Sequence, residues 1–455
     1  MNFFTARKSG ESGWPTQAPA LRLLDVPARL QVPLAVRPSA DQIAHKPAGT
    51  RVAKGERLCE LGVAGSPAAL APTSGRIVGA SQVQLLNGSI VPAVDIEADF
   101  EDRPLPGQTH DALHAQDQHE HLEGLANAGF QDLAAWIDRL RNAGVWAERP
   151  GSPDLLAQLH RALRQPVDTI VCNLLDDEPT MRLNSILAAR SGPTLLAGIG
   201  LLAKLTEARR VCLVVEAGSP GKWWTPLRRL ARKVRLEIAP IVNDYPQGEA
   251  TMLLLTVLNR RLKPGRSPID QKVLLLDAAA TISVGRCATR EQPMLQVPLA
   301  VRDHHRLRTH FLVVPVGMSL RQVFQQCEIP IEGAILRRGA VLRENEIPPD
   351  AVVSGGDLTV HVMPRQSTPL PDPCIRCSWC VESCPVGVQP AGLLEAAQRT
   401  DLELARDYGL DSCIECGVCS YMCPSRLPLL AGIRSLKKEL VGSAPRTNDL
   451  GVPVT

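Results

Sequence analysis

Cys374-Ile-Arg-Cys-Ser-Trp-Cys-Val-Glu-Ser-Cys-Pro385 and Cys413-Ile-Glu-Cys-Gly-Val-Cys-Ser-Tyr-Met-Cys-Pro424 are two copies of one cysteine pattern near the end of the 455-residue chain. In each copy three cysteines are separated by two residues, and a fourth cysteine directly precedes a proline. This is the ligand spacing of a domain that binds two [4Fe–4S] clusters, in which the fourth cysteine of each run ligates the other cluster. The spacing therefore predicts one interlocked unit that needs both runs.

The same rule predicts the ligands of each cluster. We expect one cluster on Cys374, Cys377, Cys380 and Cys423. We expect the other on Cys413, Cys416, Cys419 and Cys384. Structural zinc is the competing interpretation, because paired C-x2-C motifs also hold a tetrahedral zinc ion. Zinc needs four ligands and does not account for the third evenly spaced cysteine or for the repeated Cys-Pro, so the clusters are favoured.

Composition limits what the rest of the chain does. A chain of 455 residues is too long for one core and predicts three or four domains. Its 50 Lys and Arg balance 47 Asp and Glu without a basic block, so we expect no nucleic-acid partner. Thiolate clusters and the lack of a secretory signal indicate a reducing compartment. Cys59, Cys172, Cys212, Cys287 and Cys327 occur singly and are expected in the core.

Changes of composition and hydrophobic pattern along the chain predict a multidomain α+β and α/β protein. We expect an irregular segment (1–28), a β-rich domain (29–100), a polar linker (101–121), an α/β domain (122–295), a small mixed domain (296–364), a proline-rich linker (365–373), the cluster domain (374–441) and a tail (442–455). The β-rich domain, with turns at Gly49 and Gly55, resembles the barrel-sandwich hybrid fold of lipoyl domains. It has no Met-Lys or Asp-Lys hairpin tip, so we expect a structural or docking role. The polar linker contains His110, His114, His119 and His121, which we interpret as solvated rather than metal-bound.

The α/β domain shows alternating periodicity. Helical patterns occur at 130–143, 194–205 and 226–234, and strand patterns at 169–174, 211–215 and 236–242. Such alternation predicts a mostly parallel sheet covered by helices, with ligands at the carboxyl ends of its strands. The apolar runs 192–205 and 273–284 are shorter than the roughly 18 to 20 residues that a membrane-spanning helix needs.

The last two domains also have readable patterns. Strands are predicted at 311–316, 333–336 and 358–362, with a helix at 319–327, an order that suits a β-grasp (SLBB-like) domain. After the second cysteine run, Leu429, Ile433, Leu436 and Leu440 form a helical apolar stripe. We expect this helix to pack on the cluster domain.

This order of parts, together with the two cysteine runs, resembles the RnfC family, whose members belong to Rnf-type (Rnf/Rsx) electron-transport complexes. The resemblance implies a peripheral iron–sulfur subunit of an NADH:ferredoxin-type ion-translocating oxidoreductase, on the cytoplasmic side of the cell membrane. It implies as partners the other subunits of a membrane-embedded complex, and NADH or a ferredoxin- or flavodoxin-type carrier as an electron source or acceptor.

In that family the α/β domain is similar to the NADH- and FMN-binding subunit of respiratory complex I. The family's flavin loop corresponds to residues 124–131, where Gly124, Gly129 and Phe130 are kept but Ala126 and Asn127 replace glycines. The resemblance also implies FMN or NADH contacts at Asn173, Asp176 and Glu178. The last two carboxylates have a second interpretation, as caps of a helix that begins near residue 179.

Two functions stay open at this stage. In the first, the chain oxidises NADH through FMN and passes single electrons to its clusters. In the second, it is an electron-transfer adaptor that takes electrons from another protein. The clusters themselves differ in one charge, because Arg376 and Glu415 occupy equivalent positions in the two runs. Since nearby cations favour the reduced state, we expect the cluster beside Arg376 to have the higher potential.

Overall fold

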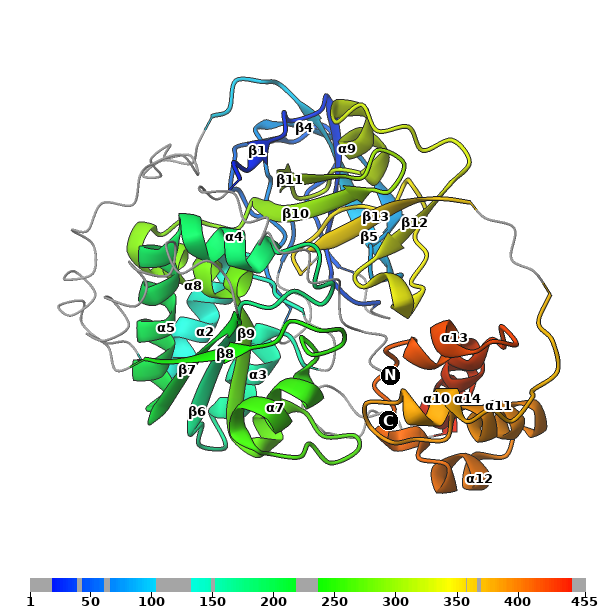
Figure 1. Ribbon diagram of the computed structural model, residues 1–455. Helices are drawn as coiled ribbons and strands as arrows, with labels where there is room; N and C mark the ends of the chain where they lie inside the picture. Colours follow the sequence, from blue (N-terminus) through cyan, green and yellow to red (C-terminus); the bar gives the residue numbers. More distant parts are fainter. Residues whose placement is uncertain are drawn as a thin grey trace.

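The computed structural model describes residues 19–38, 43–60, 66–103, 132–148, 152–217, 236–356, 358–365 and 370–443. Figure 1 shows its sheets gathered in one part of the molecule and the helical C-terminal domain, orange to red, beside them. The predicted flavin loop (124–131), the four linker histidines and the predicted helix at 226–234 lie outside the described residues.

A parallel sheet forms the centre of the α/β domain, as the alternating pattern predicts. Its order is β8-β7-β6-β9, and each neighbouring pair is parallel. The strands are β6 (Thr169–Asn173), β7 (Arg210–Glu216), β8 (Glu237–Ile241) and β9 (Val273–Asp277). The helices are α2 (Leu133–Asn142), α3 (Leu155–Ala162), α4 (Leu183–Arg190), α5 (Gly192–Thr206), α7 (Ala250–Leu258) and α8 (Ala278–Arg290). Strands β6 and β9 are buried throughout, because helices cover both faces.

The apolar run 273–284, for which the sequence pattern predicts no element, forms a strand followed directly by a helix. Asp277 ends β9 and caps α8, with its Oδ1 accepting the Ala280 N–H at 2.7 Å. Helix α8 packs so closely on α5 that a Cβ at Gly198 would lie only 2.2 Å from the Thr281 carbonyl oxygen. Among the described residues no single helix is long and apolar enough to cross a membrane, although α4 and α5, bent by 95°, pass that test as a pair.

The small mixed domain is a five-stranded sheet of order β1-β11-β10-β13-β12. Its strands are β1 (Arg22–Leu23), β10 (Gln296–Asp303), β11 (Arg308–Pro315), β12 (Ala334–Arg338) and β13 (Thr359–Pro364), and its helix is α9 (Leu320–Gln326). Two antiparallel hairpins meet where β10 pairs parallel with β13. Strand β1 corrects the expectation of an irregular segment 1–28, because residues 22 and 23 pair with the otherwise open edge of β11.

The β-rich N-terminal domain shares a hydrophobic core with this sheet. Its strands, in the order β2-β5-β4-β3, are β2 (Arg29–Pro33), β5 (Ile90–Ala98), β4 (Gly75–Gln84) and β3 (Arg51–Val52). Leu30 and Ile96 from this sheet lie in one buried cluster with Leu299 and Val360 from the other. The two domains therefore form one body, on which the turns of the small domain are held rigidly.

A buried histidine in this body makes its stability depend on pH. His361 on β13 is 1% exposed, and its Nδ1 lies 3.0 Å from His304 Nε2. Burial lowers the pKa of His361 to about 4. The unfolded chain therefore binds a proton that the folded chain does not, and stability present above pH ~6.5 is lost as the pH falls toward ~4. We expect a loss of about 3 kcal/mol over that window.

Urea denaturation at pH about 7 and about 4, followed in the full chain and in His361→Asn, measures this effect. In His361→Asn the free energy of unfolding is expected to change much less with pH. An equal pH slope in both proteins contradicts the assignment.

The C-terminal domain consists of short helices around the cysteine runs. They are α10 (Trp379–Glu382), α11 (Pro390–Arg399), α12 (Leu402–Asp407), α13 (Val418–Met422) and α14 (Leu429–Ser443). Leu429, Ile433 and Leu436 on α14 are buried in the core of this domain together with Leu393 and Leu410. The prediction that the apolar stripe packs on the cluster domain is confirmed. All five single cysteines are buried, as expected.

Candidate metal centre

Each cysteine run forms a loop with the same backbone shape. Arg376 and Ser378 have φ values of 53° and 64°, and Glu415 and Gly417 have 53° and 79°. A short helix follows each loop, α10 after Ser378 and α13 after Gly417. Left-handed backbone costs energy at residues other than glycine, so two such loops indicate a constraint shared by both runs. In the second loop the Glu415 N–H points at Cys413 Sγ, at 3.4 Å.

The last cysteine of the first run lies with the first three of the second. Cys384, Cys413, Cys416 and Cys419, which we call the inner set, line one pocket. Burial raises the pKa of the Cys416 thiol to about 11 and that of Cys419 to about 12. Negative charge on Cys413 and Cys384 raises both pKa values further. Four sulfur atoms from two distant runs thus converge on one place.

The other four cysteines form what we call the outer set, Cys374, Cys377, Cys380 and Cys423. Burial raises the pKa of Cys380, and negative charge on Cys377 and Cys423 raises it further, so Cys423 lies beside the first run. The Leu427 N–H donates to Cys423 Sγ at 3.5 Å. Cys374 is exposed, at the outer edge of the domain.

The donor chemistry of these sets fits iron–sulfur clusters. Neighbouring buried thiolates repel one another, and soft thiolate sets of this kind bind Fe–S clusters or zinc. Across the described ranges no group of three or more His, Cys, Asp or Glu side chains is placed to hold a metal ion. The inner set supplies the four cysteine ligands that a [4Fe–4S] cluster needs.

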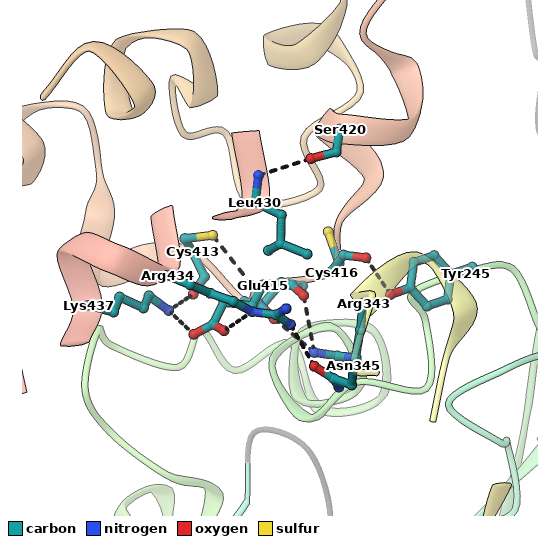
Figure 2. A network of polar contacts seen from close by, with 11 residues as sticks. Tyr245, Arg343, Asn345, Cys413, Glu415, Cys416, Ser420, Leu430, Arg434 and Lys437 are labelled. Carbon is teal, nitrogen blue, oxygen red and sulfur yellow. Dashed lines mark hydrogen bonds and ion pairs between the residues drawn. The ribbon is translucent and has the colours of Figure 1, made fainter. Parts of the chain in front are cut away.

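A buried arginine joins the inner loop to the two neighbouring domains. Arg343, on the turn after β12, pairs with Asp177 of the α/β domain, with Nε 3.2 Å from Oδ2. Its Nη1 donates to the Ile414 carbonyl oxygen at 3.1 Å. Tyr245 of the α/β domain donates its hydroxyl to the Cys416 carbonyl oxygen at 2.5 Å. Figure 2 shows Tyr245 and Arg343 beside the cysteine loop.

Two cations of the cluster domain surround Glu415. Arg434 Nε lies 3.1 Å from Glu415 Oε2, and Lys437 Nζ lies 3.0 Å from Oε1. Lys437 also donates to the Cys413 carbonyl oxygen at 2.6 Å (Figure 2). Burial raises the pKa of Glu415, but Lys437 and Arg434 outweigh it and bring the pKa below its usual value. The Glu415 charge is therefore neutralised in place.

Close packing fixes the inner loop against the small domain. Gly417 has φ +79°, and a Cβ on it would lie 1.8 Å from the Leu342 carbonyl oxygen. Only glycine suits this contact, because it tolerates the left-handed region and has no side chain to clash.

Beside the inner loop a cleft of about 1080 Å³ separates the cluster domain from the loop after α7, with Cys413, Lys437, Glu249 and Arg261 among its lining residues.

Of the predicted flavin and NADH contacts that the structure describes, Asn173 ends β6, and Asp176 and Glu178 lie in the loop that follows it. Asn173 is buried, donates to the Gly248 carbonyl oxygen at 3.2 Å and accepts the Leu175 N–H at 2.9 Å. Asp176 is also buried and accepts the backbone N–H of Asn184, in the first turn of α4, at 3.2 Å. Its contacts agree with the interpretation as a helix cap.

Glu178 points to the small domain. Its Oε2 accepts the Val341 N–H at 3.3 Å, and its Oε1 accepts from the Thr180 hydroxyl at 3.2 Å. Burial raises the pKa of Glu178 above its usual value. With Asp177, which pairs with Arg343, it ties the loop after β6 to the turn after β12.

Sequence reasoning missed Arg343, Asp177 and the contact that Tyr245 makes. No local motif marks Arg343, which lies in a three-residue turn among many other arginines. Lys437 carries a weak signal, because it follows Ile433 by one helical turn and so shares its face.

Two protein families match parts of the chain. The family described as the Nuo51 FMN-binding domain matches residues 155–286, so the match begins after the predicted flavin loop. The family described as the 4Fe–4S dicluster domain matches residues 369–427, which include both cysteine runs.

Curated relatives match over most of the chain. The C subunit of the ion-translocating oxidoreductase complex of Rhodobacter capsulatus is 25% identical over 92% of this chain and 79% of its own length. The C subunit of the Na⁺-translocating ferredoxin:NAD⁺ oxidoreductase complex of Acetobacterium woodii is 22% identical over 88% of each chain. The corresponding protein of Pasteurella multocida is 26% identical over 67% of this chain, but the match spans only 37% of that protein.

Proposed function

Because the chain is a relative of the C subunits of ion-translocating oxidoreductase complexes, we propose that it relays electrons through two [4Fe–4S] clusters as a component of such a complex. One observation carries the proposal: the last cysteine of each run lies beside cysteines of the other run, Cys384 beside Cys413, Cys416 and Cys419, and Cys423 beside Cys380, as a two-cluster domain requires. When bound, each cluster accepts and donates one electron at a time.

In this proposal the inner cluster is held by Cys384, Cys413, Cys416 and Cys419, and the outer cluster by Cys374, Cys377, Cys380 and Cys423. Cys416 and Cys419 of the inner set are buried, whereas Cys374 of the outer set is exposed at the surface. The inner cluster therefore faces the α/β and small domains, from which Tyr245 and Arg343 make contact, and the outer cluster is the one open to a partner.

We assign the remaining parts as the sequence pattern predicts. The hairpin–helix–hairpin order with parallel central strands supports a β-grasp domain at 296–364, which β1 extends. The four-stranded sheet and the bridges His45–Cys59 and Arg57–Leu70 support a barrel-sandwich hybrid at 29–100. The α/β domain then spans 122–295 and the cluster domain 374–441. We place the chain on the cytoplasmic side of the cell membrane, bound to membrane-embedded partner subunits.

The source of the electrons has two candidates. The first candidate is NADH, oxidised through FMN. It is supported by the match to an FMN-binding domain and by the cleft beside Cys413, which is large enough for a nucleotide. For an adaptor fed by a ferredoxin- or flavodoxin-type protein, the support is that Asn173, Asp176 and Glu178 already bond to protein groups. Ala126 in place of a glycine of the flavin loop supports the adaptor as well.

Flavin content separates the two candidates. The full chain is reconstituted anaerobically with iron, sulfide and FMN, and cluster absorbance is followed after addition of NADH and then of dithionite. We expect dithionite to reduce the clusters in either case. About one bound FMN per chain with reduction by NADH decides for the NADH-oxidising subunit. Reduction by dithionite alone, with no bound FMN, decides for the adaptor. A chain that forms no clusters contradicts both.

A further inference from the structure

The electron relay proposed above gives no role to Lys437 and Arg343, the two cations that contact the inner loop. We propose that these two cations offset the burial of the inner set and hold the reduction potential of the inner cluster up, so that it remains reducible. The inference rests on the proposed ligand set and goes beyond it by naming the residues that set the potential.

The inner and outer sets differ in their access to water. Cys416 and Cys419 are 7% and 8% exposed, whereas Cys374 is exposed, as are Ile375 and Trp379 beside it. Reduction adds a negative charge to a cluster, and burial disfavours charge. Without compensation the inner cluster would therefore be the harder of the two to reduce.

The cations that compensate for this burial contact backbone carbonyl groups of the inner loop. Lys437 Nζ is 2.6 Å from the carbonyl oxygen of Cys413, and Arg343 Nη1 is 3.1 Å from that of Ile414. Arg343 is 6% exposed, so water screens its charge little. Arg434 adds a third cation. Asp177 and Glu415 contact these cations, and the charge of Glu249 also acts on Arg343.

The opposite charges of Arg376 and Glu415 are therefore not expected to set the difference in potential between the two clusters. Arg376 is exposed, so solvent screens it. Glu415 is paired with two cations, so its negative charge does not act alone on the inner cluster. We expect Lys437 to affect a cluster potential more than Arg376 does, although Arg376 lies within one of the runs.

Potentiometric titration of the reconstituted full chain, read by EPR, tests the inference. The inner signal is identified as the one that disappears in Cys384→Ser. In Lys437→Gln we expect the inner midpoint to fall by at least tenfold in the reduction equilibrium, which is about 59 mV for a one-electron couple. The outer midpoint should not move. Lys437→Arg keeps the charge and should keep the inner midpoint, and Arg376→Gln, the matched exposed control, should shift neither midpoint comparably.

Arg343→Gln provides a second variant with the same expected direction, in case one substitution alters the domain packing. An unmoved inner midpoint in both variants, at full iron content, overturns the inference and leaves the relay intact. Equal shifts of both midpoints, or equal shifts in Lys437→Gln and Lys437→Arg, also overturn it, because they indicate a change of shape rather than of charge. Loss of both clusters from the unmodified chain would instead refute the proposed function.

Discussion

Replacing Cys384 by serine is expected to remove the cluster of the second cysteine run, although Cys384 belongs to the first. Cys384 lines the inner pocket with Cys413, Cys416 and Cys419. Its loss leaves the inner cluster with three thiolates, while the outer set keeps its four. We expect iron to fall from about eight to about four atoms per chain, with the outer EPR signal retained.

Cys423→Ser is the reciprocal variant and should remove the outer cluster and spare the inner one. Cys287→Ser is the control, because Cys287 is a buried cysteine of the α/β domain and belongs to neither set. Loss of the outer signal in Cys384→Ser, with the inner signal kept, would mean that each run ligates its own cluster.

Replacing Gly417 by alanine is expected to separate the cluster domain from the rest of the molecule. The new Cβ would lie 1.8 Å from the Leu342 carbonyl oxygen, so the loop or the turn must move. That movement also stretches the bonds from Arg343 to Ile414 and from Tyr245 to Cys416. We expect a larger radius of gyration by small-angle X-ray scattering.

Gly387→Ala is the matched control. Gly387 also has a positive φ, of +71°, and lies three residues after a ligand cysteine, but a Cβ there meets nothing within 4 Å. Both variants incur the left-handed backbone cost of roughly 1–2 kcal/mol, so only the clash distinguishes them. We expect Gly417→Ala to be less stable than Gly387→Ala by about 2 kcal/mol or more. Equal stability and equal dimensions would contradict the docked arrangement.

The parts that the sequence could predict are those set by local spacing. The positions of the cysteines, the parallel order of the central sheet and the apolar stripe at Leu429, Ile433 and Leu436 follow from periods of a few residues. The strand–helix pair at 273–290 was missed because its apolar residues run continuously across Asp277. Only the cap that Asp277 makes distinguishes the strand from the helix.

The surroundings of the inner set could not be predicted, because they depend on contacts between domains. Arg343, Asp177 and Ile414 lie far apart in the chain and meet only where three domains pack together. The comparison of Arg376 with Glu415 assumed that each charge acts alone, whereas Glu415 is neutralised by Lys437 and Arg434 from α14. The expectation about Arg376 and Glu415 stays a prediction, to which the structure adds the two cations that pair with Glu415.

Iron and acid-labile sulfide analysis of the anaerobically reconstituted full chain, with EPR of the dithionite-reduced protein, tests the central claim most directly. The account predicts about eight iron and about eight sulfide per chain and two reduced-cluster signals. Tight binding of zinc without sulfide, or at most one cluster in a chain with all eight run cysteines intact, would contradict it.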